Sequence, residues 1–376
     1  MIIFLLTFLF LYGGIHFYAF MRARSIFHFS PVLQILIAVL FFLLIFAPAL
    51  VRIAESRQLE ALARFIAYVG YLWMAFIFLF FVLNITFDLF KVIINFFSGT
   101  MVNMSLNKIT FGLAALLSLV LVFYGFVDAC VVRVKKLEVR TNQELANNGK
   151  IRIVQISDVH IGLIIKEKRL QSVIDKVKEA DPDILVSTGD LLDGEINNIM
   201  PLAELLSPIK PKYGKYAITG NHEYYAGIDE SLKFTRKAGF EVLRDEIRQV
   251  AGINIVGFDD ITGRKSVIVN ENSRITKTMP PIPDDKFVLL LKHQPYVNKN
   301  NNFNLQLSGH THGGQIFPFR LITRLFFENN YGYYKLGEER LLYVSRGTGT
   351  WGPPVRVFAP PEITVIDIIG KKSDLN

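Results

Sequence analysis

Long apolar runs fill the first 130 residues of the chain, and they limit what this part can fold into. A bilayer core is crossed by a helix of about 20 mostly apolar residues. Runs of this length are Ile2–Phe20, Pro31–Val51, Phe65–Phe87 and Ile109–Val127. Asp, Glu, Lys and Arg are absent from the middle of each run, which is typical of an anchor and not of a transporter or proton pump. We therefore predict a membrane domain over residues 1–130 with about four transmembrane helices.

Two features of this region admit alternatives. The first run would also suit a signal peptide, but it lacks a basic leading segment and a small-x-small cleavage site, which favours a retained helix. Val92–Asn107 mixes apolar residues with Asn, Ser and Gly, so it suits an interfacial segment or a re-entrant loop. Besides anchoring the chain, the helices would offer a lateral surface to a lipid substrate.

The basic residues beside the runs bear on orientation. With both ends of the membrane domain in the cytoplasm, seven Lys and Arg lie on the cytoplasmic side and four on the other. This excess favours a cytoplasmic position for the remaining chain. Arg22 and Arg24, which follow the first run, argue for the opposite orientation. We predict an integral membrane protein whose larger part is cytoplasmic.

Residues 131–376 have the composition of a soluble globular protein. They hold 34 Lys and Arg against 29 Asp and Glu, a net charge of +5. This excess is small and contains no strong basic run, so we expect no nucleic-acid partner. It would suit a surface near anionic lipid headgroups, although a solvated basic face needs no partner. The single cysteine, Cys130, rules out an intrachain disulfide, which fits a reducing compartment without requiring one.

Strand-like and helix-like segments alternate after residue 150. Ile184–Thr188 reads as a buried strand, and Lys166–Ala180 reads as a helix with one apolar face. Five times a short apolar strand ends and the next few residues include Asp, His or Asn. Sites in open α/β sheets form at the carboxyl ends of strands. We predict a linker over 131–149 and an α/β domain over 150–376, with these polar residues gathered in one place.

The polar residues at the strand ends have the chemistry of metal ligands. The set is Asp158, His160, Asp190, Asn221, His222, His293, His310 and His312. Carboxylates and imidazoles without thiolates select a borderline metal such as Zn²⁺, Mn²⁺ or Fe. The set is too large for one tetrahedral ion and suits two divalent ions, which would share a carboxylate and a hydroxide. Such a hydroxide attacks phosphorus at neutral pH, so the pattern indicates metal-assisted hydrolysis of a phosphate ester or anhydride.

The same residues resemble a known family. Asp158-Val159-His160, Gly189-Asp190, Gly220-Asn221-His222-Glu223, His293 and Gly309-His310-Thr311-His312 are similar, in order and spacing, to the five sequence blocks of the calcineurin-like metallophosphoesterases. The resemblance covers about residues 150–370. It implies an α/β fold in which a β-sandwich is flanked by helices, an αββα arrangement, behind the transmembrane helices.

A narrower resemblance concerns two C-terminal stretches. His310–Gln315 and Ser345–Glu362 are similar to a membrane-associated bacterial branch of the family. That branch includes phosphodiesterase-like proteins and UDP-2,3-diacylglucosamine pyrophosphohydrolases of lipid A synthesis. The resemblance implies a bacterial inner membrane and a lipid-linked substrate.

The family pattern implies a role for each residue. One metal ion would take Asp158, His160, Asp190 and His312, and the other Asp190, Asn221, His293 and His310, with Asp190 bridging. His222 would face the substrate and protonate the leaving oxygen. Asp193 stands where related phosphatases place an acid that orients this histidine, although a turn residue would suit the position equally. Gly194 replaces the arginine of the protein phosphatases, which speaks against a phosphoprotein substrate.

Some residues outside the five blocks have two readings. The aromatic tract Phe317–Tyr334 suits core packing or a lipid-facing rim that admits an acyl chain. Arg346 and Arg356 suit a bidentate grip on phosphate or ordinary ion pairs. Asp259-Asp260 reads as a turn, and Glu223 as a local cap.

Three functions compete. The first is a membrane-anchored two-metal phosphohydrolase that cleaves a phosphodiester or pyrophosphate by metal-bound hydroxide, on a lipid-linked substrate such as UDP-diacylglucosamine. The second is a broad phosphodiesterase acting on soluble nucleotides. The third is an inactive membrane sensor or scaffold with a phosphoesterase fold. The complete set of ligand types argues against the third.

Overall fold

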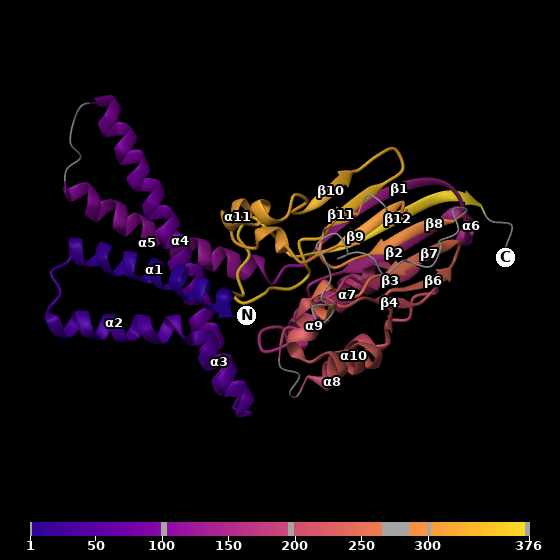
Figure 1. The fold of residues 1–376 in the computed structure, drawn as a ribbon, viewed down its shortest axis with the longest axis horizontal. Helices are drawn as coiled ribbons and strands as arrows, with labels where there is room; N and C mark the ends of the chain where they lie inside the picture. Colours follow the sequence, from indigo (N-terminus) through magenta and orange to yellow (C-terminus); the bar gives the residue numbers. More distant parts are fainter. Residues whose placement is uncertain (1, 99–103, 195–198, 265–285, 299–301, 373–376) are drawn as a thin grey trace. The chain divides into compact units, whose positions relative to one another are not determined.

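The computed structural model describes residues 2–98, 104–194, 199–264, 286–298 and 302–372. The chain divides into two compact units (Figure 1). The first unit is Met1–Val127 together with Gly352–Val357, and the second is Asp128–Trp351 together with Phe358–Asn376. The boundary near residue 130 therefore lies where the apolar composition of the sequence ends.

The first unit is helical. Its helices are α1 (Ile2–Ile26), α2 (Pro31–Ile45), α3 (Ala47–Ser56), α4 (Glu60–Ser98) and α5 (Met104–Asp128). The side chain of Ser30 caps α2 by accepting a hydrogen bond from the N–H of Leu33, and Pro31 occupies the first turn, where its missing N–H costs nothing.

Within the described residues, two or three helical segments are long and apolar enough to cross a membrane. Among the described residues, Glu60–Phe97 and Leu106–Asp128 are long and apolar enough, and a third span exists only if α2 and α3 count as one. The sequence predicts about four spans over residues 1–130, and that number stays a prediction. The predicted run Pro31–Val51 is bent by 55° where α2 meets α3. Pro48 explains the break, since its ring clashes with the carbonyl of residue 44 and it lacks an N–H.

The part of the expected re-entrant segment that lies in the described range is helical. Val92–Ser98 continues α4 without a break, and residues 99–103 lie outside the described residues. Three charged side chains of this unit form one cluster: Asp88 of α4 accepts hydrogen bonds from Arg22 of α1 (2.7 Å) and from Lys91 (3.1 Å). Such pairing is compatible with an anchor.

Two six-stranded sheets form the second unit, within the range that the structure describes. In spatial order the first sheet contains β1 (Arg133–Leu145), β12 (Glu362–Lys372), β2 (Lys150–Ile156), β3 (Ile184–Ser187), β4 (Lys215–Ala217) and β5 (Glu241–Val242). The second contains β10 (Gly332–Lys335), β11 (Leu341–Val344), β9 (Leu305–Ser308), β8 (Phe287–Leu291), β7 (Ile253–Gly257) and β6 (Glu246–Val250). Strands β2 to β5 run parallel to one another, as do β7, β8, β9 and β11.

The two sheets face each other across one apolar core. Ile153 and Val186 of the first sheet belong to the same buried cluster as Ile255, Leu289 and Leu307 of the second. Helices complete the unit: α6 (Ala146–Gly149), α7 (Glu167–Ala180), α8 (Met200–Leu206), α9 (Asn221–Ala226), α10 (Ile228–Lys237) and α11 (Phe319–Phe326), with short 3₁₀ turns at Ile261–Arg264 and His312–Gly314. Helix α7 contacts β12 and α10 contacts β5, beside the first sheet (Figure 1). The predicted α/β sandwich is confirmed.

The linker predicted over residues 131–149 is wrong for most of its length. Arg133–Leu145 forms β1, which pairs in parallel with β12 at the edge of the first sheet. Val139 and Leu145 are buried in the core between the sheets. Pairing with a strand more than 200 residues away supplies the partner that the local sequence does not reveal.

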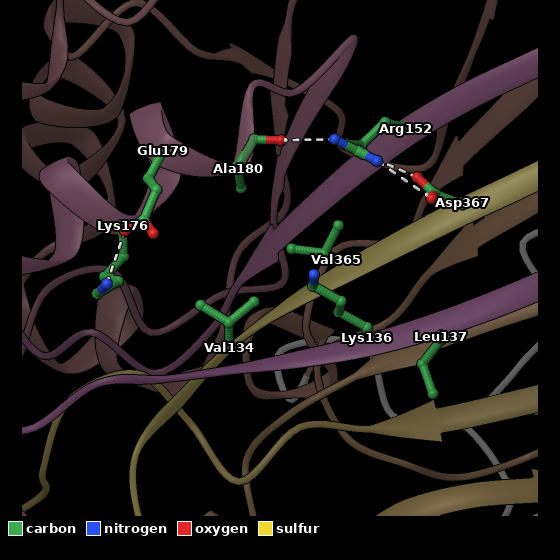
Figure 2. A pocket seen from close by; sticks show the side chains of 9 residues that line it. All are labelled: Val134, Lys136, Leu137, Arg152, Lys176, Glu179, Ala180, Val365 and Asp367. Atoms are coloured by element: carbon green, nitrogen blue, oxygen red, sulfur yellow. Dashed lines mark hydrogen bonds and ion pairs between the residues drawn. The ribbon is translucent and has the colours of Figure 1, made fainter.

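A pocket of about 320 Å³ lies between α7 and the first sheet (Figure 2). Arg152 lies on one of its walls and donates two hydrogen bonds to the carboxylate of Asp367, at 2.8 and 3.2 Å. Lys150 lies 2.9 Å from the same carboxylate. The hydrogen bonds from Arg152, followed by those from Lys150, lower the pKa of Asp367. This pair joins β2 to β12.

We expect Asp367→Asn to lower the free energy of unfolding by roughly 0.5–1 kcal/mol at pH 7, because the pair is partly exposed and therefore screened. The pKa of Asp367 is lower in the folded chain than in the unfolded chain. The contribution of Asp367 to the free energy of unfolding is therefore present above the ordinary carboxyl pKa. It is lost as the pH falls through the pKa of Asp367 in the folded chain. Urea titrations followed by proteolysis would measure the difference, with exposed Glu338→Gln as control. A difference that grows toward acid pH would contradict this account.

Candidate metal centre

The candidate ligands follow five strands whose carboxyl ends meet at one edge of the sandwich. Asp158 and His160 follow β2, Asp190 follows β3, Asn221 and His222 follow β4, His293 follows β8, and His310 and His312 follow β9. The first three strands are parallel neighbours in one sheet, and the last two are parallel neighbours in the other. The structure therefore brings together all eight residues that the sequence places at strand ends.

Several of these residues have a backbone conformation that side chains rarely adopt. The φ angles of Asp158, His160, Asp190, His310 and His312 are positive, between 51° and 72°. Such a conformation costs of order 1–3 kcal/mol per residue and persists where the surroundings impose it. Here the positive φ turns the backbone sharply after the strand, so that the side chain lies toward the centre of the site.

One group of donors consists of Asp158, His160 and His312. The Nε2 atoms of the two imidazoles lie 3.1 Å apart, and Nε2 of His312 lies 3.6 Å from Oδ1 of Asp158. The three residues are buried, and their donor atoms lie within 4.8 Å of one another. This is the spacing expected of side chains that share one cation.

A second group consists of Asp190, His293 and His310, with Asn221 beside it. Nε2 of His293 lies 3.2 Å from each of three atoms: Oδ2 of Asp190, Oδ1 of Asn221 and Nδ1 of His310. The donors of Asp190, His293 and His310 again lie within 4.8 Å of one another.

Asp190 connects the two groups. Its Oδ2 lies 3.2 Å from Nε2 of His293 in the second group and 3.9 Å from Nε2 of His160 in the first. Its Oδ1 accepts a hydrogen bond of 2.9 Å from the N–H of His222. The carboxylate is therefore fixed between the two groups of imidazoles.

The donor set fits cations better than it fits an empty site. Two neutral imidazole nitrogens at 3.1–3.2 Å repel each other unless a proton or a metal ion lies between them. Burial lowers the pKa of His310 to about 3, with help from the neighbouring His293, so its nitrogens stay available as ligands. Burial opposes the charge on His293 too, but the Asp190 carboxylate outweighs it and holds the pKa of His293 well above its usual value.

Two glycines allow the ligand loops to approach closely. A Cβ atom on Gly309 would overlap the side-chain oxygens of Ser157 and Asp158. A Cβ atom on Gly220 would overlap Oδ1 of Asp190. The glycines that precede His310 and Asn221 therefore leave room for the two carboxylates.

Glu223 holds two of the loops together, a role that sequence reasoning missed. It is buried, and its carboxylate accepts hydrogen bonds from the N–H groups of Asp190 (3.0 Å), Leu191 (2.8 Å), Leu192 (3.2 Å) and Gly220 (2.7 Å). Burial, together with the nearby Asp190 carboxylate, raises the pKa of Glu223 to about 7. Glu223 therefore caps its own helix, as expected, and also fixes the Asp190 loop.

Asp193 stands closer to His160 than to His222, the residue it is expected to orient. Its Oδ1 lies 3.2 Å from Nδ1 of His160 and 3.6 Å from Nδ1 of His222. The Nδ1–H of His222 instead donates to the backbone carbonyl of Asp193. The side chain of Asp193 is therefore placed to act on both histidines.

The other polar candidates are engaged elsewhere. Arg346 forms an ion pair with buried Glu362 (2.6 Å), and the Arg356 side chain is fully buried, so neither presents a guanidinium to a substrate. Asp259 binds Arg244 (2.6 Å), and Asp260 accepts a hydrogen bond from Gln294 (3.1 Å), next to His293. Asp260 therefore supports the loop that carries His293.

Two exposed aromatic residues beside His222 were not expected from the sequence. The ring centroids of Tyr225 and Trp351 lie 5.4 and 6.1 Å from that of His222. Both rings are exposed. The sequence does not show that Trp351 lies near His222, because the two residues are far apart in the chain and meet only in the folded structure.

Comparison with known proteins agrees with this geometry. The family described as calcineurin-like phosphoesterase matches residues 151–314. An uncharacterized metallophosphoesterase of Aquifex aeolicus is 38% identical over 255 residues, which are 66% of this chain and 96% of the relative. A similar protein of Campylobacter jejuni is 35% identical, over 70% of this chain and 71% of the relative.

A third relative is named as a membrane protein. The "transmembrane protein with metallophosphoesterase domain" of Danio rerio is 31% identical over 268 residues, which are 68% of this chain and 61% of the relative. The family match covers the part of the chain that contains the candidate ligands, Asp158 to His312. The chain therefore belongs to the calcineurin-like metallophosphoesterases and is a metal-dependent phosphoesterase.

Proposed function

We propose that the chain is a membrane-anchored phosphohydrolase that uses two divalent metal ions to cleave a phosphodiester or a pyrophosphate. The observation that carries this proposal is the position of Asp190, whose Oδ2 lies between Nε2 of His293 and Nε2 of His160. A carboxylate shared by two groups of imidazoles is what a pair of neighbouring cations requires.

The residues divide between the two ions as the family pattern implies. Asp158, His160 and His312 would hold one ion, Asn221, His293 and His310 the other, and Asp190 both. With oxygen and imidazole donors, Mn²⁺, Zn²⁺ and Fe all fit. When bound, such ions polarise phosphate oxygens and lower the pKa of coordinated water.

His222 is the proposed acid for the leaving oxygen. Its Nδ1–H donates to the backbone carbonyl of Asp193, which has no proton to give in return. Nε2 is therefore the only ring nitrogen that can give a proton to the substrate or take one from it. The Asp193 carboxylate lies 3.6 Å from Nδ1 of the same ring.

Asp193 would also act on a metal ligand. The Asp193 carboxylate, 3.2 Å from Nδ1 of His160, would favour this ring orientation and leave Nε2 available to hold an ion. We therefore assign Asp193 a positioning role toward both His160 and His222.

For the substrate, we propose a lipid-linked phosphate ester or pyrophosphate, such as UDP-diacylglucosamine. The membrane helices place the enzyme on the surface that carries such molecules. A phosphodiesterase acting on soluble nucleotides is the second candidate, and the exposed rings of Tyr225 and Trp351 favour it because aromatic rings stack on bases. A UDP-linked lipid would use both features. The complete donor set argues against an inactive scaffold.

For the location, we propose a bacterial inner membrane with the second unit in the cytoplasm. Arg57 and Arg64 flank the start of α4, and Arg133, Lys135 and Lys136 follow α5, whereas Lys91 and Lys108 lie toward the other ends of these helices. The basic excess beside the start of α4 and the end of α5 favours the cytoplasm for that side.

The activity is tested with bis(4-nitrophenyl) phosphate and two variants. We expect Asp190→Asn, or removal of metal by a chelator, to lower turnover by about 100-fold or more. Mutation of residues that only hydrogen-bond to metal ligands already lowers metal affinity or activity by about 10–100-fold. We expect His222→Ala to retain its metal. Its kcat should fall by about 10²–10⁴-fold on a diester with an alkoxide leaving group and much less on the 4-nitrophenyl ester, whose leaving group needs no proton.

Metal content measured by mass spectrometry is the control for both variants. A chain that binds no metal, or whose turnover is the same in both variants as in the unaltered protein, would show that the proposed mechanism is wrong and would favour a scaffold.

The close approach at Gly309 gives a separate test of the metal site. In Gly309→Ala the new Cβ displaces the carboxylate of Asp158, so we expect metal affinity to fall by at least about tenfold. The matched control is Gly337→Ala, where a Cβ has open space. Calorimetric titration with Mn²⁺ or Zn²⁺ compares the two, and equal affinities would remove Asp158 from the proposed ligand set.

The single cysteine tests the orientation. Cys130 is exposed and follows the end of α5. A membrane-impermeant maleimide should leave it unlabelled in intact bacterial cells and label it in inside-out vesicles. Lys108→Cys in a Cys130→Ser background, at the other end of α5, should show the reverse pattern. Labelling of Cys130 in intact cells would place the second unit outside.

A further inference from the structure

Helix α11 presents an apolar face that the described protein does not cover. Leu321, Ile322, Leu325 and Phe326 are all exposed, Leu325 by 81% and Phe326 by 70%. No residue of this fully described helix is buried. Large apolar side chains gathered on a surface mark a contact with another molecule or with a membrane.

The sequence of α11 has the pattern of a helix that lies in a membrane surface. Leu321 and Leu325 are four residues apart, as are Ile322 and Phe326, so the four side chains share one side of the helix. Arg320 and Arg324 are also four apart, and Phe319–Phe326 contains no Asp or Glu. An apolar face combined with arginines suits the boundary between acyl chains and anionic headgroups.

The exposed face extends beyond the helix to a residue close to the membrane unit in the chain. Phe317 and Phe358 are exposed, and their ring centroids lie 6.2 Å apart. Arg320 Nη2 donates to the carbonyl of Phe358 (2.9 Å). Phe358 directly follows Val357, the last residue of the segment that belongs to the first unit.

That segment is bound to a membrane helix within the first unit. The N–H of Arg356 donates to the carbonyl of Gly125 in α5 (2.8 Å), and a Cβ on Gly125 would overlap Val355. Two residues therefore separate the packing partner of α5 from an exposed apolar residue of the α11 face. This continuity with a membrane-spanning helix favours lipid as the molecule that covers the face.

Helix α11 is also tied to the candidate metal centre. The ring centroid of Phe327, the residue after the helix, lies 5.1 Å from that of His310. Arg320 Nε donates to the carbonyl of Gly313 (3.3 Å), and a Cβ on Gly314 would overlap the Arg320 backbone. The α11 helix and the loop that carries His310 and His312 therefore keep a fixed position relative to each other.

From these contacts we infer that the α11 face, formed by α11 with Phe317 and Phe358, lies in the interfacial layer of the membrane and directs the metal centre toward phosphate esters carried by lipids. The membrane contact is independent of the chemistry. The choice of a lipid-borne ester rests on the phosphohydrolase activity proposed above.

The contact is tested in the full chain, in nanodiscs of phosphatidylethanolamine and phosphatidylglycerol. Leu325→Cys in a Cys130→Ser background carries an environment-sensitive fluorophore, and brominated lipids serve as quenchers. We expect quenching at least several-fold stronger than for the same label at Glu230→Cys, an exposed position on α10. Equal quenching at the two positions overturns the contact. A label that is shielded from bromolipid in a dimeric chain assigns the face to a second copy and also overturns it.

The substrate arm uses two esters with the same reacting group: hexadecyl 4-nitrophenyl phosphate in vesicles and soluble ethyl 4-nitrophenyl phosphate. Leu325→Asp with Phe326→Asp removes two apolar side chains from the face, so we expect turnover of the hexadecyl ester to fall at least about tenfold. Turnover of the ethyl ester should be unchanged.

Equal loss on both esters, or loss on neither, overturns the inference, because the α11 face would then not serve lipid substrates. If the unaltered chain cleaves neither ester, the proposed activity fails and with it the lipid-borne substrate, while the quenching experiment still decides the membrane contact on its own.

Discussion

The buried carboxylate of Asp190 is the constraint on which the second unit depends. A carboxylate that is removed from water is stable only beside positive charge or several hydrogen-bond donors. Asp190 has the imidazoles of His293 and His160 on one side and the N–H of His222 on the other. Burial would raise the pKa of Asp190, but the imidazoles of His293, His222 and His160 hold it well below its usual range. Side chains that follow strands of both sheets are needed for this, so the site exists only where the two sheets meet at one edge.

This arrangement requires backbone that is costly to form. Five candidate ligands, none of them glycine, have positive φ. The Glu223 carboxylate accepts four hydrogen bonds from the backbone of the Asp190 and Gly220 loops. Turns of this kind are stable only where a rigid core over-determines them. The cluster of Ile153, Val186, Leu289 and neighbouring residues between the sheets supplies that rigidity. The stability of the core therefore offsets the strain at the edge where the ligands meet.

The sequence predicts those features of the site that depend on short local sequence patterns. A short apolar run followed by Asp, His or Asn marks a strand end, and five such ends in order predict one edge of a sandwich. Contacts between distant residues have no such mark. The pairing of β1 with β12, the position of Asp193 beside His160 and the approach of Trp351 to His222 all depend on folding. Hydropathy also ignores the effect of Pro48 on helix geometry, so the apolar run Pro31–Val51 did not predict the bend between α2 and α3.

The anchor and α11 are best explained together. A chain with membrane-spanning helices is already held at the bilayer, so an additional apolar helix adds nothing to its location. It does carry a cost, since exposed Leu325 and Phe326 reduce solubility. The cost is understandable if α11 sets the orientation of the candidate metal centre relative to the bilayer. Membrane-spanning helices alone would leave that centre free to face away from the lipid. Arg320 and Gly314 join α11 to the loop of His310 and His312, so a helix resting in the interface would turn the open side of the candidate metal centre toward the bilayer.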